Sequence, residues 1–208
     1  MSRLPLSPIS GASSNASAGE FSESDRALLL QLAHASILSA LDLIEKDSPL
    51  VGASTASTRL HEPRGVFTSL YLRGELRGCV GYVLPNGPVY KAVAETARAA
   101  AFEDTRFRPV TREEAPHLEI ELSILSPPQT LSPEAIEIGR HGLLITMDER
   151  RGLLLPQVPI EHHWDRITFL EQTCRKAGLA IDAWRQGATI EAFTAEVFRD
   201  ANDESVDR

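Results

Sequence analysis

The chain has 208 residues, of which 42% are hydrophobic and 24% charged, the composition of an ordinary soluble globular protein. Its formal net charge of -8 and pI near 5.3 argue against binding to nucleic acid or to an anionic membrane, since both favour a basic surface. The two cysteines, Cys79 and Cys174, are too few for a disulfide framework, although one bridge between them stays open. We therefore expect a reducing, cytoplasmic compartment.

The first 21 residues predict a disordered leader, because they are rich in Ser, Ala, Gly and Pro and carry Arg3 as their one cation. They lack the cationic start and continuous apolar core of a signal peptide. No apolar run approaches the roughly 20 residues of a membrane-spanning helix, so we expect no membrane contact. Residues 22–200 are expected to form a single domain, and residues 201–208 an acidic tail.

Apolar residues at helical spacing predict a first helix, which begins at Ser22 or Ser24 and ends near Glu45. An irregular connection follows over residues 46–62, because Asp, Ser, Pro, Gly and Thr recur there without a period.

Residues 66–81 predict a β-hairpin. Its strands are residues 66–72 and 75–81, and Arg73-Gly74 forms the turn. Side chains alternate across a strand, so Arg77, Cys79 and Gly81 are expected on one face and Gly78 on the other. The expected register sets Arg77 opposite Leu70 and Cys79 opposite Thr68.

Two interpretations of Arg77 and Cys79 stay open. In the first, the guanidinium lowers the pKa of the thiol or binds an anionic group, and Gly78 and Gly81 leave room for a ligand. In the second, Arg77 pairs with a carboxylate and Cys79 packs as a small hydrophobic residue.

A helix of small residues is expected from Pro88 to about Glu103, close against a sheet. Asp104 and Arg106 follow it, where opposite charges around an aromatic residue commonly hold a loop in place. Thr111 and Glu114 have capping-box spacing for a short helix. We expect Arg77 or Arg106 to form an ion pair with Asp104 or Glu121, because a buried unpaired charge is costly.

Residues 118–125 alternate as a half-buried strand, with Glu121 on its outward face. Residues 132–136 predict one helical turn, and His141 lies in a glycine-flanked segment before a second hairpin of residues 143–147 and 153–155. A polar turn over residues 148–152 joins these strands.

Gln157 follows that hairpin, and a helix is expected from about Glu161 to Ala177 with Cys174 on its buried face. The adjacent His162 and His163 would point apart on such a helix and make a poor metal pair, so we expect no metal. A turn or short helix over residues 182–186 precedes a final strand over residues 190–198. Hairpins with singly interposed helices predict an α+β fold with a largely antiparallel sheet.

The chain lacks the sequence signatures of a P-loop, a dinucleotide-binding loop, HExxH and CxxC, so no cofactor is expected. A thiol, an imidazole and a carboxylate could assemble as nucleophile, base and orienting group if folding joins Cys79, His141 and Glu121. Substrate binding would then fall to nearby polar and glycine positions, namely Arg77, Gly78, Gly81, Asp104, Arg106 and Gln157.

Several segments in order, LRGCVG, DTRFRPVT, EIELSIL, IGRHGL and LLLPQV, resemble the AMMECR family, also called AmmeMemoRadiSam system protein A. Val80 and Tyr82 depart from its hallmark. The resemblance implies an α+β domain of two unequal lobes with a cleft, and association with a Memo-like protein and a radical-SAM protein.

Two hypotheses follow. The chain is the A component of that three-part system and processes or holds an intermediate around Cys79, or it is a non-catalytic adaptor that docks the two partners. An RNA-binding regulator is disfavoured by the charge of -8. Whether the chain is an enzyme, its substrate and its oligomeric state are left open by the sequence.

Overall fold

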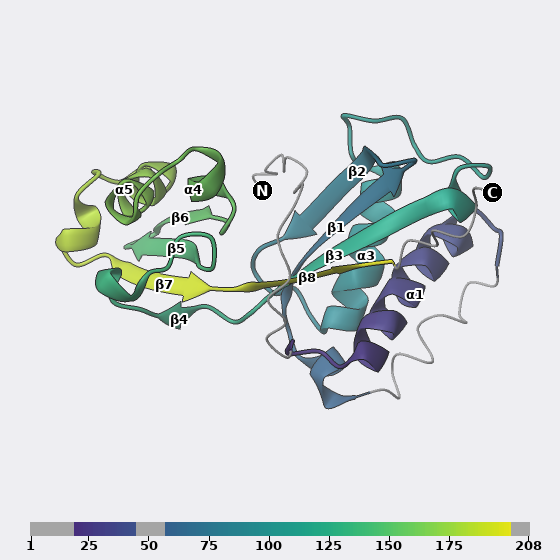
Figure 1. The fold of residues 1–208 in the computed structure, drawn as a ribbon, viewed down its shortest axis with the longest axis horizontal. Helices are drawn as coiled ribbons and strands as arrows, with labels where there is room; N and C mark the ends of the chain where they lie inside the picture. Colours follow the sequence, from purple (N-terminus) through teal and green to yellow (C-terminus); the bar gives the residue numbers. More distant parts are fainter. Residues whose placement is uncertain (1–18, 45–56, 201–208) are drawn as a thin grey trace, which may run out of the picture. The chain divides into compact units, whose positions relative to one another are not determined.

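The computed structural model of the protein describes residues 19–44 and 57–200, which divide into two compact units (Figure 1). Unit 1 comprises residues up to Ile124 together with those from Glu196 onward, and unit 2 comprises Leu125–Ala195. The fold is α+β with two antiparallel sheets, as the alternation of hairpins and single helices predicts. None of the helices within the described ranges has the length and hydrophobicity that crossing a bilayer requires.

Unit 1 is a four-stranded sheet covered on one face by two helices. The strand order is β2-β1-β3-β8, from Glu75–Tyr82, Gly65–Leu72, Leu118–Leu125 and Ala195–Arg199. Helix α3, Val89–Phe102, packs against β1 and β2, and α1, Glu23–Ala40, packs against α3. A 3₁₀ turn, Thr58–His61, precedes β1, and another, Ala115–His117, precedes β3. The predicted hairpin, both helices and the strand over 118–125 are confirmed, although α1 ends five residues earlier than Glu45.

Helix α3 lies very close to the sheet because the residues at their contact are small. A Cβ atom on Gly78 would overlap the carbonyl oxygen of Ala100, so the main chains of β2 and α3 meet directly there. Nearby, the buried hydroxyls of Thr68 and Thr96 lie 2.7 Å apart and satisfy one another. The face of the sheet that carries Thr68 and Gly78 is therefore the face toward α3.

The hairpin register differs from the predicted one. Cys79 lies opposite Ser69, and Gly78 lies opposite Leu70, because the pairing shifts by one residue between Leu70 and Tyr71. Arg77 is the extra residue of this β-bulge, which alternation alone does not reveal. The prediction that Arg77 and Cys79 lie opposite Leu70 and Thr68 is wrong.

The predicted final strand over residues 190–198 is two strands in two sheets. Strand β7, Thr189–Phe193, belongs to unit 2, and β8 resumes after Thr194 in the sheet of unit 1, beside β3 (Figure 1). Hydrogen bonds join Ser126 N to Thr194 O at 2.9 Å and Asp200 N to Ile120 O at 3.1 Å. Residue numbers rise on one strand as they fall on the other, so β3 and β8 run antiparallel.

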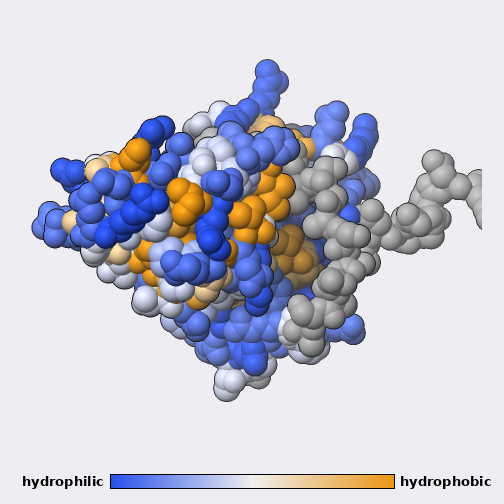
Figure 2. All heavy atoms as spheres, turned by 60° about the vertical axis from the view of Figure 1, so that its left-hand side comes forward, coloured by the Kyte–Doolittle hydropathy of each residue, from blue (hydrophilic) through white to orange (hydrophobic). Residues whose placement is uncertain are grey.

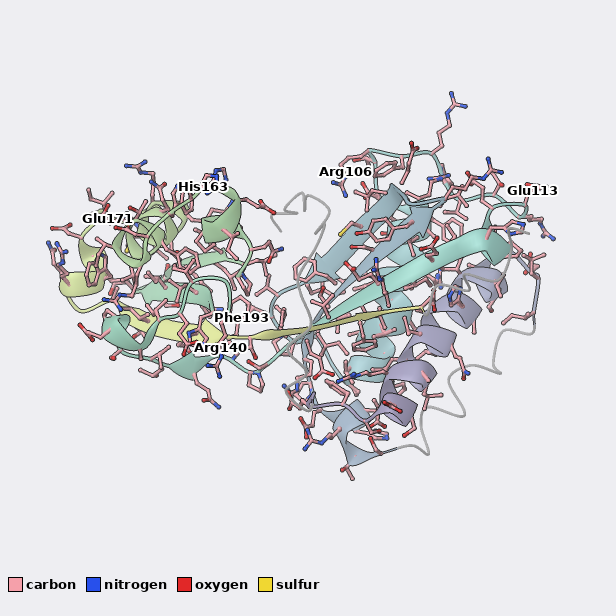
Figure 3. All side chains as sticks on the ribbon, in the orientation of Figure 1. Arg106, Glu113, Arg140, His163, Glu171 and Phe193 are labelled. Atoms are coloured by element: carbon pink, nitrogen blue, oxygen red, sulfur yellow. The ribbon has the colours of Figure 1, made fainter. Side chains whose placement is uncertain are left out.

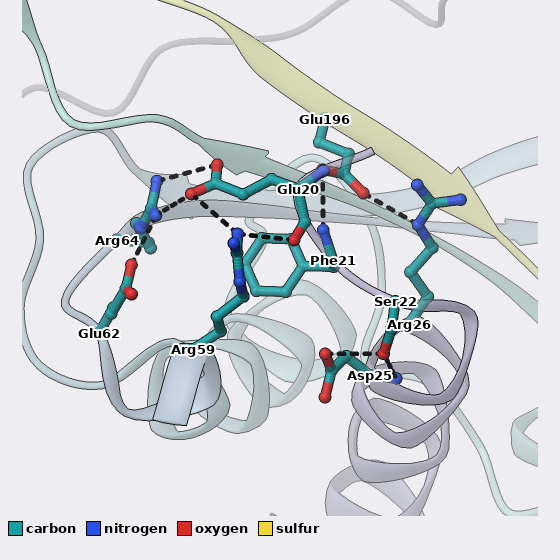
Figure 4. Close-up of polar contacts among 9 residues, drawn as sticks. All are labelled: Glu20, Phe21, Ser22, Asp25, Arg26, Arg59, Glu62, Arg64 and Glu196. Carbon is teal, nitrogen blue, oxygen red and sulfur yellow. Dashed lines mark hydrogen bonds and ion pairs between the residues drawn. The ribbon is translucent and has the colours of Figure 1, made fainter. Parts of the chain in front are cut away.

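The residues just before α1 are tied to β8 (Figure 4). The Glu196 carboxylate accepts hydrogen bonds from the main-chain N–H groups of Glu20 and Phe21 and from Arg26 Nε, at 2.6, 3.3 and 2.9 Å. Glu20 also pairs with Arg64, whose side chain is 4% exposed, and Phe21 is buried in the core. Of the predicted leader, residues 1–18 lie outside the described residues, as does the tail over 201–208. Residues 19–21 belong to the folded unit, so the boundary predicted at Ser22 is too late.

Unit 2 is a second four-stranded sheet with the order β4-β7-β5-β6. Strands β4, β5 and β6 are Gln129–Thr130, Gly142–Met147 and Arg150–Leu154, and Pro133–Ala135 and Ala183–Arg185 are 3₁₀ turns. The second hairpin, the helical turn near 132–136 and the turn near 182–186 are confirmed. The hairpin turn is shorter than the predicted 148–152, because β6 begins at Arg150. The core includes Phe169, Leu170 and Cys174, so the predicted core position of Cys174 is confirmed.

The predicted helix from Glu161 to Ala177 is divided into α4, Val158–Glu161, and α5, Arg166–Lys176. The break has a local cause, because the Asp165 side chain caps α5 by accepting a hydrogen bond from Thr168 N at 2.8 Å. His163 takes a left-handed conformation in the break, at φ 53°, and His162 stacks on Trp164. The two histidines therefore do not lie on a continuous helix.

The face of the molecule drawn in Figure 2 is mainly hydrophilic. Figure 2 shows one face of the molecule, on which apolar side chains form separate patches among hydrophilic ones. Large apolar side chains that are well exposed include Leu84, Ile160, Ile181 and Val197. Dispersed exposure of this kind is normal for a globular protein.

The close approach of α3 and β2 gives a first prediction. Gly78→Ala should lower the free energy of unfolding by about 1–3 kcal/mol, because the added methyl group forces two main chains apart. Chemical denaturation measures the change. Gly74→Asn is the matched control: Gly74 has open space around it and φ +79°, which Asn tolerates, so its cost should stay below about 1 kcal/mol. Equal losses in the two variants would contradict the packing argument.

Candidate functional site

Cys79 projects from β2 onto the face of the sheet that α3 does not cover. This orientation follows from the alternation of side chains, because its neighbour Gly78 faces α3. The thiol is 7% exposed, and the Ser69 hydroxyl, directly across on β1, donates a hydrogen bond to Cys79 Sγ at 3.3 Å. Cys79 and Cys174 are both free thiols.

The main chain of Cys79 is held by Asp104 and Arg106. Cys79 N–H donates to Asp104 Oδ2 at 2.9 Å, and Arg106 Nη2 donates to the Cys79 carbonyl oxygen at 3.2 Å. The two side chains form an ion pair with each other at 2.7 Å, which confirms the predicted pairing of Arg106 with Asp104. Figure 3 shows Arg106 on the loop after α3, from which its side chain reaches β2.

This pair occupies the free edge of the sheet. Strand β2 is an edge strand, so its outward N–H and C=O groups lack a strand partner. At Cys79, the Asp104 carboxylate accepts the hydrogen bond that the carbonyl group of a neighbouring strand would accept. The Arg106 guanidinium donates the hydrogen bond that an N–H group of such a strand would donate. The pKa of Asp104 is held at about 2, because the hydrogen bonds from Arg106 and from the Cys79 N–H group favour the ionised carboxylate.

Arg77 turns toward the same loop and away from the thiol. It forms an ion pair with Glu114 at 2.9 Å and donates to the carbonyl oxygens of Arg108 and Pro109, at 2.7 and 3.2 Å. This bonding lowers the pKa of Glu114, which also forms the predicted reciprocal capping box with Thr111. The structure supports the interpretation in which Arg77 pairs with a carboxylate.

In the part of the chain that the structure describes, no group lowers the pKa of the Cys79 thiol enough to activate it as a nucleophile. Burial raises its pKa, and Asp104 and Glu121 raise it further, whereas the Ser69 hydrogen bond and the charge of Arg106 oppose the shift. The expected lowering of this pKa by Arg77 is therefore wrong, because the cation that acts on the sulfur is Arg106 and its effect is outweighed. Cys79 is a neutral thiol at pH 7.

Tyr71, Glu121 and Arg199 are further polar groups on this side of the sheet. Burial raises the pKa of Glu121, and Arg199 partly offsets the rise. Burial, Glu121 and Cys79 all raise the pKa of Tyr71. The sequence did not identify Ser69, Tyr71 or Arg199 as candidate site residues. Alternation gives the face of each strand, but the adjacency of β1, β3 and β8 depends on the strand order.

The two predicted glycine positions have steric roles. Gly78 admits α3, and a Cβ atom on Gly81 would overlap the ring of Phe67, the residue directly across from it on β1. Because Gly81 has no side chain, the Phe67 ring can occupy the space directly over this position of β2. Both glycines shape the hairpin that presents the thiol.

His141 and Gln157 belong to unit 2. His141 Nδ1 accepts a hydrogen bond from Glu137 N at 3.0 Å, and burial and the neighbouring Arg140 lower its pKa. Gln157 is the N-cap residue of α4, where its carbonyl oxygen accepts from Ile160 N and Glu161 N. The proposed grouping of either residue with Cys79 stays a prediction.

The similarity to known proteins extends over the segments that form this site. A model of the AMMECR1 family matches residues 30–198, which include the hairpin of Cys79, the loop of Asp104 and Arg106, and unit 2. The chain belongs to the AMMECR1 family.

Relatives in this family span most of the chain. Protein MK0488 of Methanopyrus kandleri is 41% identical over 187 residues, which are 85% of this chain and 88% of that protein. A protein of Aquifex aeolicus is 45% identical over 145 residues, 65% of this chain and 74% of the relative. The crystal structure of the uncharacterised protein PH0010 from Pyrococcus horikoshii is similar with a TM-score of 0.63 and 36% identity, covering 83% of this chain and 89% of that one.

The Asp104 carboxylate gives a pH-dependent prediction. Its folded pKa is depressed from 3.8 to about 2, so its stabilisation is present above pH 3.8 and is lost as the pH falls toward 2. Asp104→Asn should lower the free energy of unfolding at pH 7 by about 2 kcal/mol, and the deficit should shrink between pH 4 and 2. Denaturation at several pH values measures it. Glu75→Gln, at an exposed position of β2, is the control, and a deficit independent of pH would contradict the assignment.

Arg77 gives a prediction for the loop. Arg77→Gln should speed hydrogen exchange at the Val110 amide, which donates to Ala101 O at 2.9 Å, because the Arg108 and Pro109 carbonyls lose their donor. The pKa of Cys79 should stay unchanged. Arg112→Gln, on the same loop but with a side chain 55% exposed, should leave the exchange rate at the parent value. A thiol pKa that rises in Arg77→Gln would instead restore the direct electrostatic role.

Proposed function

We propose that this chain is the A component of a three-part system with a Memo-like protein and a radical-SAM protein. Its contribution is to process or hold an intermediate that the radical-SAM partner makes. Membership of the AMMECR1 family supports the proposal at the coarser level, and the two partners are carried by the resemblance of the LRGCVG and DTRFRPVT segments to that family.

The observation that carries a role for Cys79 is the placement of its thiol. The sulfur shares one sheet face with a carboxyl group of raised pKa, Glu121, while its main chain is held by two charged side chains. A nucleophile needs a base that is available near neutral pH, and a carboxyl group with a raised pKa fits that requirement. Arg106, whose side chain is 37% exposed, is the candidate for contact with an anionic part of the intermediate.

A non-catalytic adaptor is the second candidate. It is favoured by the raised pKa of Cys79, which keeps the thiol neutral, and by the steric roles of Gly78 and Gly81. Under this hypothesis the motif shapes the hairpin, and the surface of the chain docks the two partners.

Replacing the sulfur separates the two candidates. Cys79→Ser should reduce the output of the three-protein system by about 100-fold if the thiol is the reacting group, because a hydroxyl is a far weaker nucleophile at neutral pH. Co-purification with the two partners and the unfolding midpoint should stay at parent values. Cys174→Ala, which removes the other thiol, is the control for the output. Parent output from Cys79→Ser with the partners still bound would establish the adaptor.

A further inference from the structure

The residues directly before α1 lie in a site of unit 1 that binds their main chain (Figure 4). Glu196 on β8 accepts hydrogen bonds from the N–H groups of Glu20 and Phe21, at 2.6 and 3.3 Å. Arg59, in the 3₁₀ turn before β1, donates to the Glu20 carbonyl oxygen at 2.7 Å. Side chains therefore bind three main-chain groups of a two-residue segment. In peptide recognition, bonds of this kind supply affinity, and pockets for the side chains supply specificity.

The carboxylate of Glu20 is bound by two arginines. Arg64 Nη1 and Nη2 donate to its two oxygens, Nη1 at 3.3 Å, and Arg59 Nη1 lies 3.6 Å from Oε1. The Arg64 side chain is 4% exposed, and its Nε atom has no hydrogen-bond partner in the described part of the chain. Its other anionic partner is Glu62, at 2.6 Å. Because a buried guanidinium that loses a carboxylate is costly, any segment that replaces Glu20 must bring a carboxylate of its own.

The positions on either side of Glu20 are also constrained. The Phe21 side chain is 2% exposed and belongs to the core of unit 1. At Gly19, a Cβ atom would overlap Arg26 Nη2 and the Glu196 carboxylate, so a larger residue there requires Arg26 to move. The site thus selects a small residue, an acidic residue and an aromatic residue in succession.

The acidic end of this site is open to solvent. The side chains of Glu20 and Arg59 are 37% and 49% exposed, whereas Phe21 is buried. A carboxylate from outside can therefore reach Arg59 while the aromatic ring is still in place.

The binding groups and the bound segment belong to different parts of the chain. Arg59, Arg64 and Glu196 lie within residues 30–198, which the AMMECR1 model matches, and Glu20 and Phe21 precede that range. The groups that bind are therefore part of the family domain, and the segment that they hold is not.

We propose that unit 1 contains a peptide-binding site for an acidic residue followed by an aromatic residue, which Gly19-Glu20-Phe21 fills as an internal ligand. The occupant that displaces the internal ligand is a segment of a different protein with the same pattern. A second copy of this chain is a poorer source, because its own segment is held next to its own site at a high effective concentration. The proposal does not depend on the Cys79 thiol, since the two sites share no residue.

Weakening the internal ligand tests the proposal. A fluorescein-labelled peptide, SAGEFSES, has the sequence of residues 17–24. It should bind the variant Glu20→Gln/Phe21→Ala about tenfold more tightly than the parent, because the site is then more often free. Fluorescence anisotropy measures the affinity. Glu23→Gln, at an exposed position in the first turn of α1, is the matched control and should keep the parent affinity.

Two further measurements test which groups recognise the peptide. The peptide SAGQASES should bind the double variant about 30-fold more weakly than SAGEFSES, because it lacks the carboxylate and the ring. Arg59→Gln, added to the double variant, should weaken binding of SAGEFSES about tenfold through loss of two contacts. Because Phe21→Ala leaves a cavity in the core, Glu20→Gln alone is measured as well and should show intermediate affinity.

Three results would overturn the proposal: no binding of SAGEFSES to either variant up to about 1 mM, equal binding of the two peptides, or no effect of Arg59→Gln. Sedimentation velocity separates the two sources of the occupant. Dimers that form only when parent and double variant are mixed would assign the site to a second copy and overturn the assignment to a different protein. Peptide binding without such dimers supports it.

Discussion

The direct contact between the main chains of β2 and α3 at Gly78 and Ala100 sets the arrangement of unit 1. The β-bulge lies at Arg77, directly before this contact, and Cys79, directly after it, points to the other face because side chains alternate along a strand. The thiol of Cys79 therefore lies on the face of the sheet opposite α3. A side chain at position 78 would separate the helix from the sheet and leave the hairpin without its support.

The segments LRGCVG and DTRFRPVT are separate in the sequence and form one structural unit in the fold. The Arg77 side chain donates hydrogen bonds to carbonyl oxygens of the loop. In return, Asp104 and Arg106 of the loop bind the main chain of Cys79. The bonds run in both directions, so each segment holds the other in position. The charged residues near the thiol are thus engaged in supporting its strand, which explains why neither arginine activates the sulfur.

Local sequence patterns predicted the helices and strands well, but they predicted less well how these elements pair and where they are interrupted. The hairpin, α3 and the Thr111–Glu114 capping box depend on residues close in sequence, and all were predicted. The bulge at Arg77, the break before Asp165 and the change of sheet at Thr194 each depend on a contact that periodicity does not encode. For the site, Cys79 and Glu121 followed from strand alternation, whereas Ser69, Tyr71 and Arg199 required the order β2-β1-β3-β8.

Strand β8 is the last strand of the unit 1 sheet to be synthesised, and its position in the sequence determines when that sheet can be completed. Glu196 binds residues 170 and 176 positions earlier in the chain, so the ribosome must complete all of unit 2 before those contacts can form. Until then β3 has an unpaired edge, which is a site for mispairing with other chains. Unit 2, whose strands and helices are contiguous in sequence, can fold while unit 1 is still incomplete. The first half of the protein to be made is therefore the last to reach its final structure.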